Sequence, residues 1–187
     1  MSFMQIGRWQ VHDDTGRRKY VSAEERRRFL SAADLLAPDM RALAYVLAYS
    51  GCRISEALEL GPHRLDPDAG ALVLRTLKRR RLAFRRVPVP PWLLAMLLDF
   101  STSDDRFWRL HRATAWRCMK CAMASAGING PMATCKGLRH GFGIHAAACG
   151  VPPNLIAKWL GHASLSTTAI YLDAVGEEER RFAERMW

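Results

Sequence analysis

The helix predicted over residues 39–51 is apolar on most of its faces, and this constrains the fold more than any other feature of the sequence. The segment reads DMRALAYVLAYSG, and its final residue, Gly51, is of the type that often ends a helix by adopting a left-handed backbone. A helix that lacks a wide polar face must be surrounded by other elements, because each apolar face has to be removed from water. We therefore expect a central helix inside a domain built mostly of helices.

The segments around this helix predict a mainly α fold with a small antiparallel β-sheet, an α+β class. The residues SAEE form a capping box from Ser22 to Glu25, which predicts a helix that continues to Pro38. The stretch ALVLRTLKRRRLAFRRVPVP reads as two strands joined at KRRR. Further helices are predicted near residues 53–60, 90–100, 111–126, 137–149, 154–160, 166–171 and 177–186.

The length and composition favour one domain with short appendages. The chain has 187 residues, of which 49% are hydrophobic, and this is enough for one sizeable core. Residues 1–20 are polar and basic without a clear period, so we expect them to form an N-terminal arm. Residues 21–187 are expected to form the domain, with a C-terminal helix over about 176–187.

The charge of the chain indicates a polyanionic partner. Its 28 Lys and Arg residues outnumber 18 Asp and Glu residues, which gives a formal net charge of +10. Such an excess repels itself unless it meets a polyanion. Arginine is the commoner cation, and its guanidinium matches two phosphate oxygens at once. Nucleic acid is therefore favoured over an anionic membrane.

The apolar and cysteine patterns argue against a membrane protein, a secreted protein and a metal site. The longest apolar stretches, such as residues 42–49, are far too short to span a membrane, and the N-terminus lacks the apolar core of a signal peptide. We expect a cytoplasmic protein. Five cysteines without a secretory signal argue against a disulfide framework, and Cys118 and Cys121 lack a second pair at zinc spacing. Core packing is expected for both.

Four stretches contain residue types suited to phosphodiester chemistry, namely GCRISEAL, RTLKRRR, KGLRHGFGIHAA and LGHASLSTTAIYLD. When a tyrosine hydroxyl attacks a phosphodiester, negative charge gathers on the nonbridging oxygens. Arg53 and Arg139 can neutralise that charge, His162 can add a hydrogen bond, and Tyr171 can be the nucleophile. His162 and Tyr171 meet only if the chain bends between them, and the Ser and Thr residues there favour a bend. Each residue taken alone also fits a structural role.

Taken in order, these motifs resemble the tyrosine recombinase, or phage integrase, family. The family pattern is an Arg in G-x-R-x-S-E, a Lys on a β-hairpin, a His or Lys three residues before a second Arg, an L-G-H motif, and a Tyr nine residues after that His; residues 22–187 contain all of it in order. The resemblance implies the tyrosine recombinase catalytic-domain fold. It also implies a site-specific DNA recombinase or integrase that cleaves and rejoins strands through a 3′-phosphotyrosyl intermediate, with no metal and no cofactor.

The resemblance assigns roles to further residues. Lys78 is implied as the proton donor to the leaving 5′ oxygen, and Lys136 as a helper on the tyrosine side. Glu56, one helical turn after Arg53, is expected to hold the Arg53 guanidinium. The other arginines of the hairpin are expected either to contact the DNA backbone or to lie on the solvated surface: Arg79, Arg80, Arg81, Arg85 and Arg86.

Two departures from the family pattern bear on the function. Most members carry a further N-terminal domain that clamps DNA, for which this chain has no room, so we expect either a minimal recombinase or a truncated form. Lys136 occupies a position where His is commoner. His140 and His145 follow the second arginine on the same helix, and structural roles are expected for both.

The partners implied are double-stranded DNA and other copies of the chain. By resemblance, a tetrameric synapse on DNA would form through the helix at residues 176–187, although this helix could instead pack on its own domain. Two alternatives to recombination stay open: a type IB topoisomerase-like relaxing enzyme, and a DNA-binding regulator that keeps the fold but does not cleave.

Overall fold

The capping box predicted at Ser22 begins the first helix of the computed structural model, which describes residues 11–76, 83–99, 105–171, 183, 184 and 186. The backbone N–H of Glu25 donates to Ser22 Oγ at 3.2 Å, and Glu25 Oε2 accepts from the Ser22 N–H at 2.9 Å. Helix α1 (Ala23–Ala33) follows. Arg18 also donates to Glu25 Oε2 at 2.8 Å, so the segment before the helix is tied to its first turn.

Helix α2 (Pro38–Ser50) is the central helix, as its apolar character predicted. It ends at Gly51, whose φ of 60° lies in the left-handed region. It contacts α1, α3, α4, α5 and α6. Its fully buried side chains, among them Leu43 and Leu47, form the middle of the larger hydrophobic core.

The remaining helices agree with most of the predicted ranges. They are α3 (Ile54–Ala57), α4 (Pro91–Asp99), α5 (Arg112–Ser125), α6 (Cys135–Ala148), α7 (Pro153–Leu160) and α8 (Ser166–Ala169), with a short 3-10 turn at Pro62–Arg64. Helix α3 is shorter than the predicted 53–60. The helix predicted over 177–186 lies largely outside the described residues. Among the described helices, none is long and apolar enough to cross a membrane.

The sheet has three antiparallel strands in the order β1-β2-β3: β1 (Leu65–Asp66), β2 (Ala71–Arg75) and β3 (Phe84–Pro88). Strands β2 and β3 form the predicted hairpin, in which Val73 pairs with Arg86. Strand β1 was not predicted, because a two-residue strand is too short to show alternation. The tip of the hairpin lies outside the described residues.

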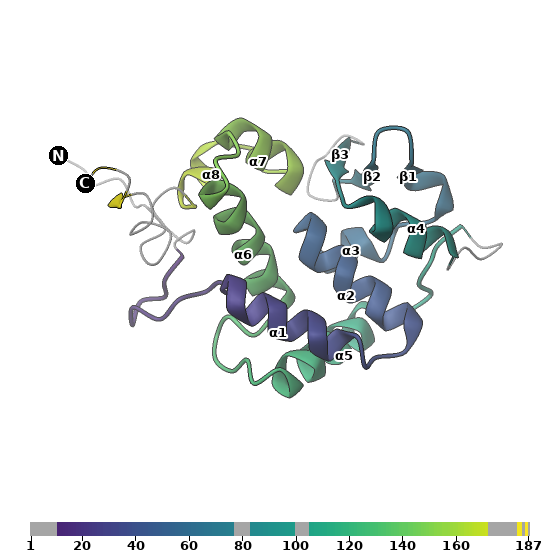
Figure 1. The fold of residues 1–187 in the computed structure, drawn as a ribbon, viewed down its shortest axis with the longest axis horizontal. Helices are drawn as coiled ribbons and strands as arrows, with labels where there is room; N and C mark the ends of the chain where they lie inside the picture. The colour runs from purple at the N-terminus through teal and green to yellow at the C-terminus, as the bar shows by residue number, and fades with distance from the viewer. Residues whose placement is uncertain (1–10, 77–82, 100–104, 172–182, 185, 187) are drawn as a thin grey trace.

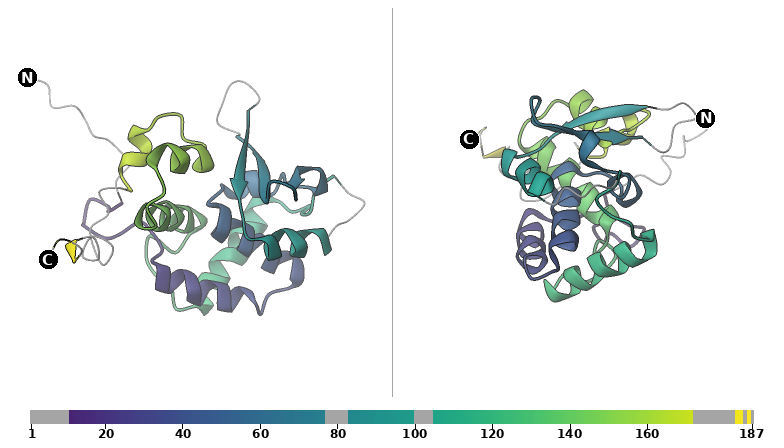
Figure 2. Two further views of the ribbon diagram at one scale, coloured as in Figure 1. Left: turned by 45° about the horizontal axis from the view of Figure 1, so that its top comes forward. Right: turned by 90° about the vertical axis from the view of Figure 1, so that its right-hand side faces the viewer.

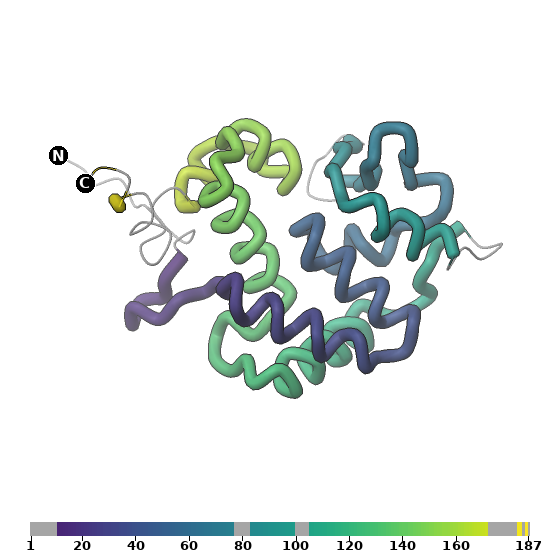
Figure 3. Tube along the Cα trace, in the orientation of Figure 1, coloured from purple at the N-terminus to yellow at the C-terminus, as the bar shows by residue number. Residues whose placement is uncertain are grey.

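Figure 1 shows α2 and α6 side by side, with α1 and α5 along one end of the molecule and α7, α8 and the sheet at the other. The further views in Figure 2 and the trace in Figure 3 keep this arrangement. Helix α7 contacts β3, so the C-terminal part of the chain touches the hairpin. A second, smaller core contains Tyr171 together with Val11 and Tyr20 of the N-terminal segment, Ile144 of α6 and Ile156 of α7.

Candidate active site

A cavity of about 650 Å³ opens where the start of α3, one face of α6 and the residues after α7 and α8 meet. Five residues selected from the sequence line it: Arg53, Lys136, Arg139, His162 and Tyr171. Lys136 and Arg139 both lie on α6, whereas the other three residues come from distant parts of the chain, so the fold brings them together. Lys78, Arg79, Arg80 and Arg81 lie outside the described residues.

Arg53 is held at the N-terminal end of α3 by Glu56. The Arg53 backbone N–H donates to Glu56 Oε2 at 2.9 Å, and its Nη1 donates to Glu56 Oε1 at 2.9 Å. Glu56 is completely buried, whereas the Arg53 side chain retains 24% exposure toward the cavity side of the molecule. This is the geometry that the supporting role expected for Glu56 requires.

A second arginine shares the Glu56 carboxylate. Arg85 of β3 donates from Nη2 to Glu56 Oε2 at 2.6 Å, from Nη1 to Thr76 Oγ1 at 3.0 Å, and from Nε to the carbonyl of Trp159 at 2.7 Å. Burial alone would raise the pKa of Glu56, but the hydrogen bond and charge of Arg85, with those of Arg53, hold this pKa below its ordinary value. The carboxylate therefore stays ionised inside the protein.

The expectation that Arg85 lies on the surface or contacts the DNA backbone is wrong. Its side chain is 5% exposed, because the alternation of β3 turns Arg85 and Val87 to the inner face. Arg86 points the other way and forms an exposed ion pair with Asp66 at 2.9 Å. The position of Arg85 two residues before Val87 was the available sequence signal.

Arg139 is anchored by carbonyl groups at the ends of two helices. Its Nη1 donates to the carbonyl of Gly51 at 2.9 Å, and its Nη2 donates to the carbonyl of Leu160 at 2.5 Å. These residues stand at the C-terminal ends of α2 and α7, where the carbonyl groups lack helical partners. Burial, with the nearby charge of Arg53, lowers the pKa of Arg139 to about 10, so it remains a cation at pH 7.

His162 follows Gly161, the left-handed residue that ends α7. Its Nδ1 and Thr168 Oγ1 are 2.8 Å apart and share a hydrogen bond. Burial, then the charges of Arg139 and Arg53, lower the pKa of His162 to about 3. His162 is therefore neutral at pH 7 and keeps one N–H to donate.

The short helix α8 supplies the bend that was expected between His162 and Tyr171. The two rings stack with centroids 6.0 Å apart and an interplanar angle of 27°. Tyr171 is 2% exposed. Burial raises the pKa of its hydroxyl, while the charges of Arg139 and Arg53 act in the opposite direction.

His140 is a site residue that the sequence reasoning placed among structural histidines. It lines the cavity, and its Nδ1 is 3.2 Å from the Tyr171 hydroxyl oxygen. Burial, then the charges of Lys136, Arg139 and Lys19, lower the pKa of His140 to about 4. Its place directly after Arg139 was the signal that could have drawn attention to it. His145, one turn further along α6, is exposed.

The cysteines give a mixed outcome. Cys118 packs half-buried against the core, as expected, but Cys121 is exposed, because its position on α5 turns it to solvent. Within the described ranges, no group of three or more His, Cys, Asp or Glu residues is arranged to hold a metal ion.

Comparison with known proteins identifies the relatives of this chain. The model of the phage integrase family matches residues 19–178. Tyrosine recombinase XerA of Thermococcus kodakarensis is 29% identical over 180 residues, which cover 89% of this chain and 62% of that protein. A crystal structure of XerA recombinase matches with a TM-score of 0.76 and 27% identity over 89% of this chain and 64% of that chain.

The fold is also that of XerH recombinase bound to its difH substrate, with a TM-score of 0.73 and 19% identity over 94% of this chain and 59% of that chain. These matches confirm the predicted fold class. The chain spans less than two thirds of the length of each of these relatives.

Proposed function

The chain belongs to the phage integrase family, and from this membership we propose that it is a site-specific DNA recombinase that cleaves and rejoins strands through a 3′-phosphotyrosyl intermediate. One observation carries the proposal. A single cavity is lined by two arginines, a neutral histidine and a tyrosine, each from a separate element. Both arginines are held in place by hydrogen bonds within the chain. This is the set of groups needed to bind and attack a phosphodiester.

In the proposed cleavage, the Tyr171 hydroxyl oxygen attacks the phosphorus atom and the 5′ oxygen leaves. Arg53 and Arg139 neutralise the charge that gathers on the nonbridging oxygens, and His162 donates a hydrogen bond to one of them. Lys78 gives a proton to the leaving oxygen, and Lys136 assists with charge and proton transfer on the tyrosine side, where the hydroxyl proton is lost as the bond to phosphorus forms. A 5′-hydroxyl from the partner strand then attacks the phosphotyrosyl bond and releases Tyr171.

The proposal includes double-stranded DNA as the partner and a tetrameric synapse as the working assembly. The formal charge of +10 supports a DNA partner, and XerH, a structural relative, was solved bound to its difH substrate. In this proposal residues 21–187 are the catalytic domain, residues 1–20 an arm, and a helix over about 176–187 joins neighbouring copies. The proposed place of action is the cytoplasm.

The test is covalent capture on nicked duplexes. The parent chain is mixed with a pool of duplexes that contain randomised arms and a nick near the scissile position, so that the released fragment diffuses away and the adduct accumulates. We expect a protein–DNA adduct that survives denaturing electrophoresis, and its attached DNA can be sequenced. Tyr171→Phe should form no adduct while keeping its fold and DNA affinity, because it removes one hydroxyl and no phosphate contact.

The same experiment separates the alternatives. DNA binding without adducts in the parent chain would favour a regulator that does not cleave. Adducts together with relaxation of supercoiled plasmid, but without resolution of a Holliday junction, would favour a topoisomerase-like enzyme.

A further inference from the structure

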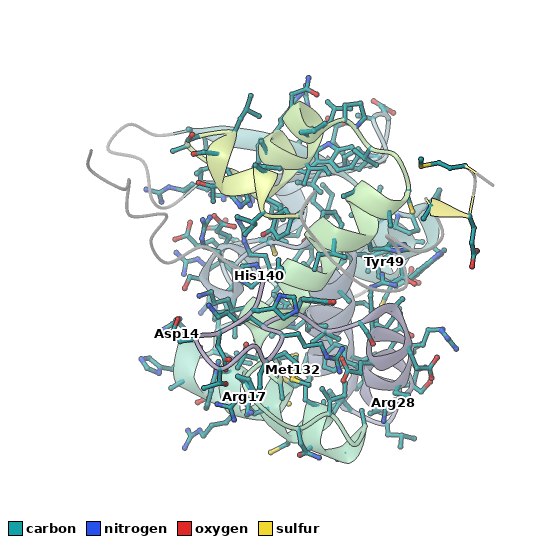
Figure 4. The ribbon with its side chains drawn as sticks, turned by 90° about the vertical axis from the view of Figure 1, so that its left-hand side faces the viewer. Asp14, Arg17, Arg28, Tyr49, Met132 and His140 are labelled. Atoms are coloured by element: carbon teal, nitrogen blue, oxygen red, sulfur yellow. The ribbon has the colours of Figure 1, made fainter. Side chains whose placement is uncertain are left out.

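His140 is a buried titratable side chain of the cavity to which the proposed cleavage gives no part. It is 4% exposed and lies on α6 directly after Arg139. Figure 4 labels it on the face where the N-terminal segment with Asp14 and Arg17 passes. A buried imidazole needs a hydrogen-bond partner, and the partner here is the nucleophile itself.

We propose that His140 is a positioning residue for Tyr171: its Nδ1 accepts a hydrogen bond from the tyrosine hydroxyl, which turns the lone pairs of that oxygen toward the scissile phosphate. The inference rests on the proposed function, because it concerns the step in which Tyr171 attacks.

The contact between the two side chains is specific. His140 Nδ1 lies 3.2 Å from the Tyr171 hydroxyl oxygen, with ring centroids 5.9 Å apart at an interplanar angle of 60°. The same tyrosine ring stacks on His162. One histidine thus contacts the face of the ring and the other contacts its hydroxyl, so the orientation of the ring and that of its oxygen are set separately.

The direction of this hydrogen bond follows from the neighbouring charges. Arg53 and Arg139 also line the cavity, and a guanidinium can only donate hydrogen bonds. The tyrosine keeps its proton at pH 7, since burial raises its pKa. His140 is neutral at that pH, since burial and the charges of Lys136, Arg139 and Lys19 lower its pKa to about 4. The neutral His140 imidazole therefore accepts the hydrogen bond that the Tyr171 hydroxyl donates.

An acceptor at this point has a direct effect on the attack. With its O–H aimed at His140, the phenolic oxygen presents its lone pairs elsewhere, free to meet phosphorus. An imidazole that donated to the oxygen would instead occupy one of its two lone pairs and leave the O–H without this acceptor. The proton on His140 therefore belongs on Nε2.

The first experiment compares three variants in single-turnover cleavage at saturating duplex. His140→Asn places an amide oxygen near the position of Nδ1, His140→Gln places it near that of Nε2, and His140→Leu has no acceptor. We expect His140→Asn to cleave within about threefold of the parent, and His140→Gln and His140→Leu to lose about 10- to 100-fold, the size of a lost hydrogen bond of 1.4 to 2.7 kcal/mol. DNA affinity should be unchanged in all three.

The outcomes are distinct. Equal rates for His140→Asn and His140→Gln would overturn the proposal, as would faster cleavage by His140→Leu, which would make the contact a restraint. Rates that follow melting temperature across the series would assign His140 a structural role. If His140→Leu fails to fold, the comparison of His140→Asn with His140→Gln still tests whether an acceptor at the Nδ1 position is required.

A second measurement does not depend on cleavage. Nitrogen NMR of the imidazole groups in the free parent chain reports which ring nitrogen carries the proton. We expect His140 to be protonated on Nε2 alone, and a proton on Nδ1 would overturn the inference. Absence of covalent adducts with an Nε2–H tautomer would count against the proposed function and leave the acceptor role of Nδ1 standing.

Discussion

At the scale of single residues, the site combines cations that keep their charge with histidines that have lost theirs. Arg139 remains charged because its pKa, although burial lowers it, is still about 10, and the carbonyl groups of Gly51 and Leu160 accept its N–H groups. His140 and His162 are neutral because burial and the neighbouring cations oppose their protonation. The cavity therefore offers both full charges and neutral hydrogen-bonding groups to a phosphate.

The neutral histidines predict that the free protein loses stability as the pH falls. The folded-state pKa values are about 4 for His140 and about 3 for His162, below the ordinary 6.5. At a pH between the folded-state and ordinary pKa values, the unfolded chain binds protons that the folded chain does not. The free energy of unfolding is therefore highest above pH 6.5 and declines as the pH falls below it. His140 should contribute more, because His162 is partly exposed.

Urea unfolding at pH 7.5, 6.5, 5.5 and 4.8 measures this effect, in a range where most carboxylates are still ionised. His140→Asn combined with His162→Asn is the control and should flatten the dependence. A free energy of unfolding that is constant over this range in the parent chain would contradict the burial of neutral imidazoles.

At the scale of elements, one buried carboxylate connects three parts of the fold. Glu56 of α3 holds Arg53 at the cavity and Arg85 of β3, and Arg85 also reaches the end of α7 through the Trp159 carbonyl. The guanidinium of Arg85 lies against Gly161, where a Cβ atom would come within 3.1 Å of it. The hairpin, α3 and the residue before His162 are thus joined by one side chain.

Arg85→Met should therefore destabilise the protein and weaken cleavage. Removing one partner from a buried ion pair costs about 3 kcal/mol or more, because the other charge is left buried. Adding Glu56→Met should recover much of the stability but not the cleavage, since Arg53 then lacks the carboxylate that orients its guanidinium. Denaturant unfolding and adduct yield measure the two effects.

The matched control is the neighbouring Arg86→Met. Its ion pair with Asp66 is exposed, so the change in stability should stay within about 0.5 kcal/mol. Equal losses for the Arg85 and Arg86 variants would refute the buried network.

Gly51 lies at the junction of α2, α6 and α7, and Gly51→Ala should disturb all three. Its φ is 60°, and an added Cβ would lie 2.6 Å from the Phe142 ring and 2.9 Å from Leu160. We expect a loss of about 3 kcal/mol from backbone strain and overpacking together, with weaker cleavage because the Gly51 carbonyl holds Arg139.

Gly70→Ala separates the two causes. Gly70 has the same φ of 60°, but an added Cβ there would meet open space. It should lose only about 1 kcal/mol, the backbone contribution alone. If thermal unfolding gave the two variants the same melting temperature, close packing at Gly51 would not matter.

At the scale of the whole molecule, the excess of positive charge predicts DNA binding that depends steeply on salt. A formal charge of +10 and a cavity lined by cations should displace several condensed counterions from the duplex. The logarithm of the affinity then falls with the logarithm of salt concentration by about 0.9 per phosphate neutralised. Fluorescence anisotropy from 50 to 300 mM salt measures the slope, and a flat titration would rule out binding through phosphates.

The sequence by itself determined the features that depend on neighbouring residues along the chain. Helical period, the capping box at Ser22 and the glycine after α2 defined the main helices, because periodicity and capping are local. The order of the motifs was enough to select five residues that the fold brings to one cavity. Their types are those that bind and attack a phosphodiester. The role of Lys78, which rests on the motif order, and the C-terminal helix, which rests on an amphipathic pattern, remain predictions.

Only the tertiary structure decided which side chains from distant segments face each other. Strand alternation turns Arg85 inward, but its partner there, Glu56 of α3, is supplied by the packing of the fold. His140 meets the Tyr171 hydroxyl because α6 and the residues after α8 pack together. The exposure of Cys121 likewise follows from how α5 rests on its neighbours. A buried charge or imidazole is stable only beside a partner, and that partner is chosen by the packing of helices and strands rather than by position in the chain.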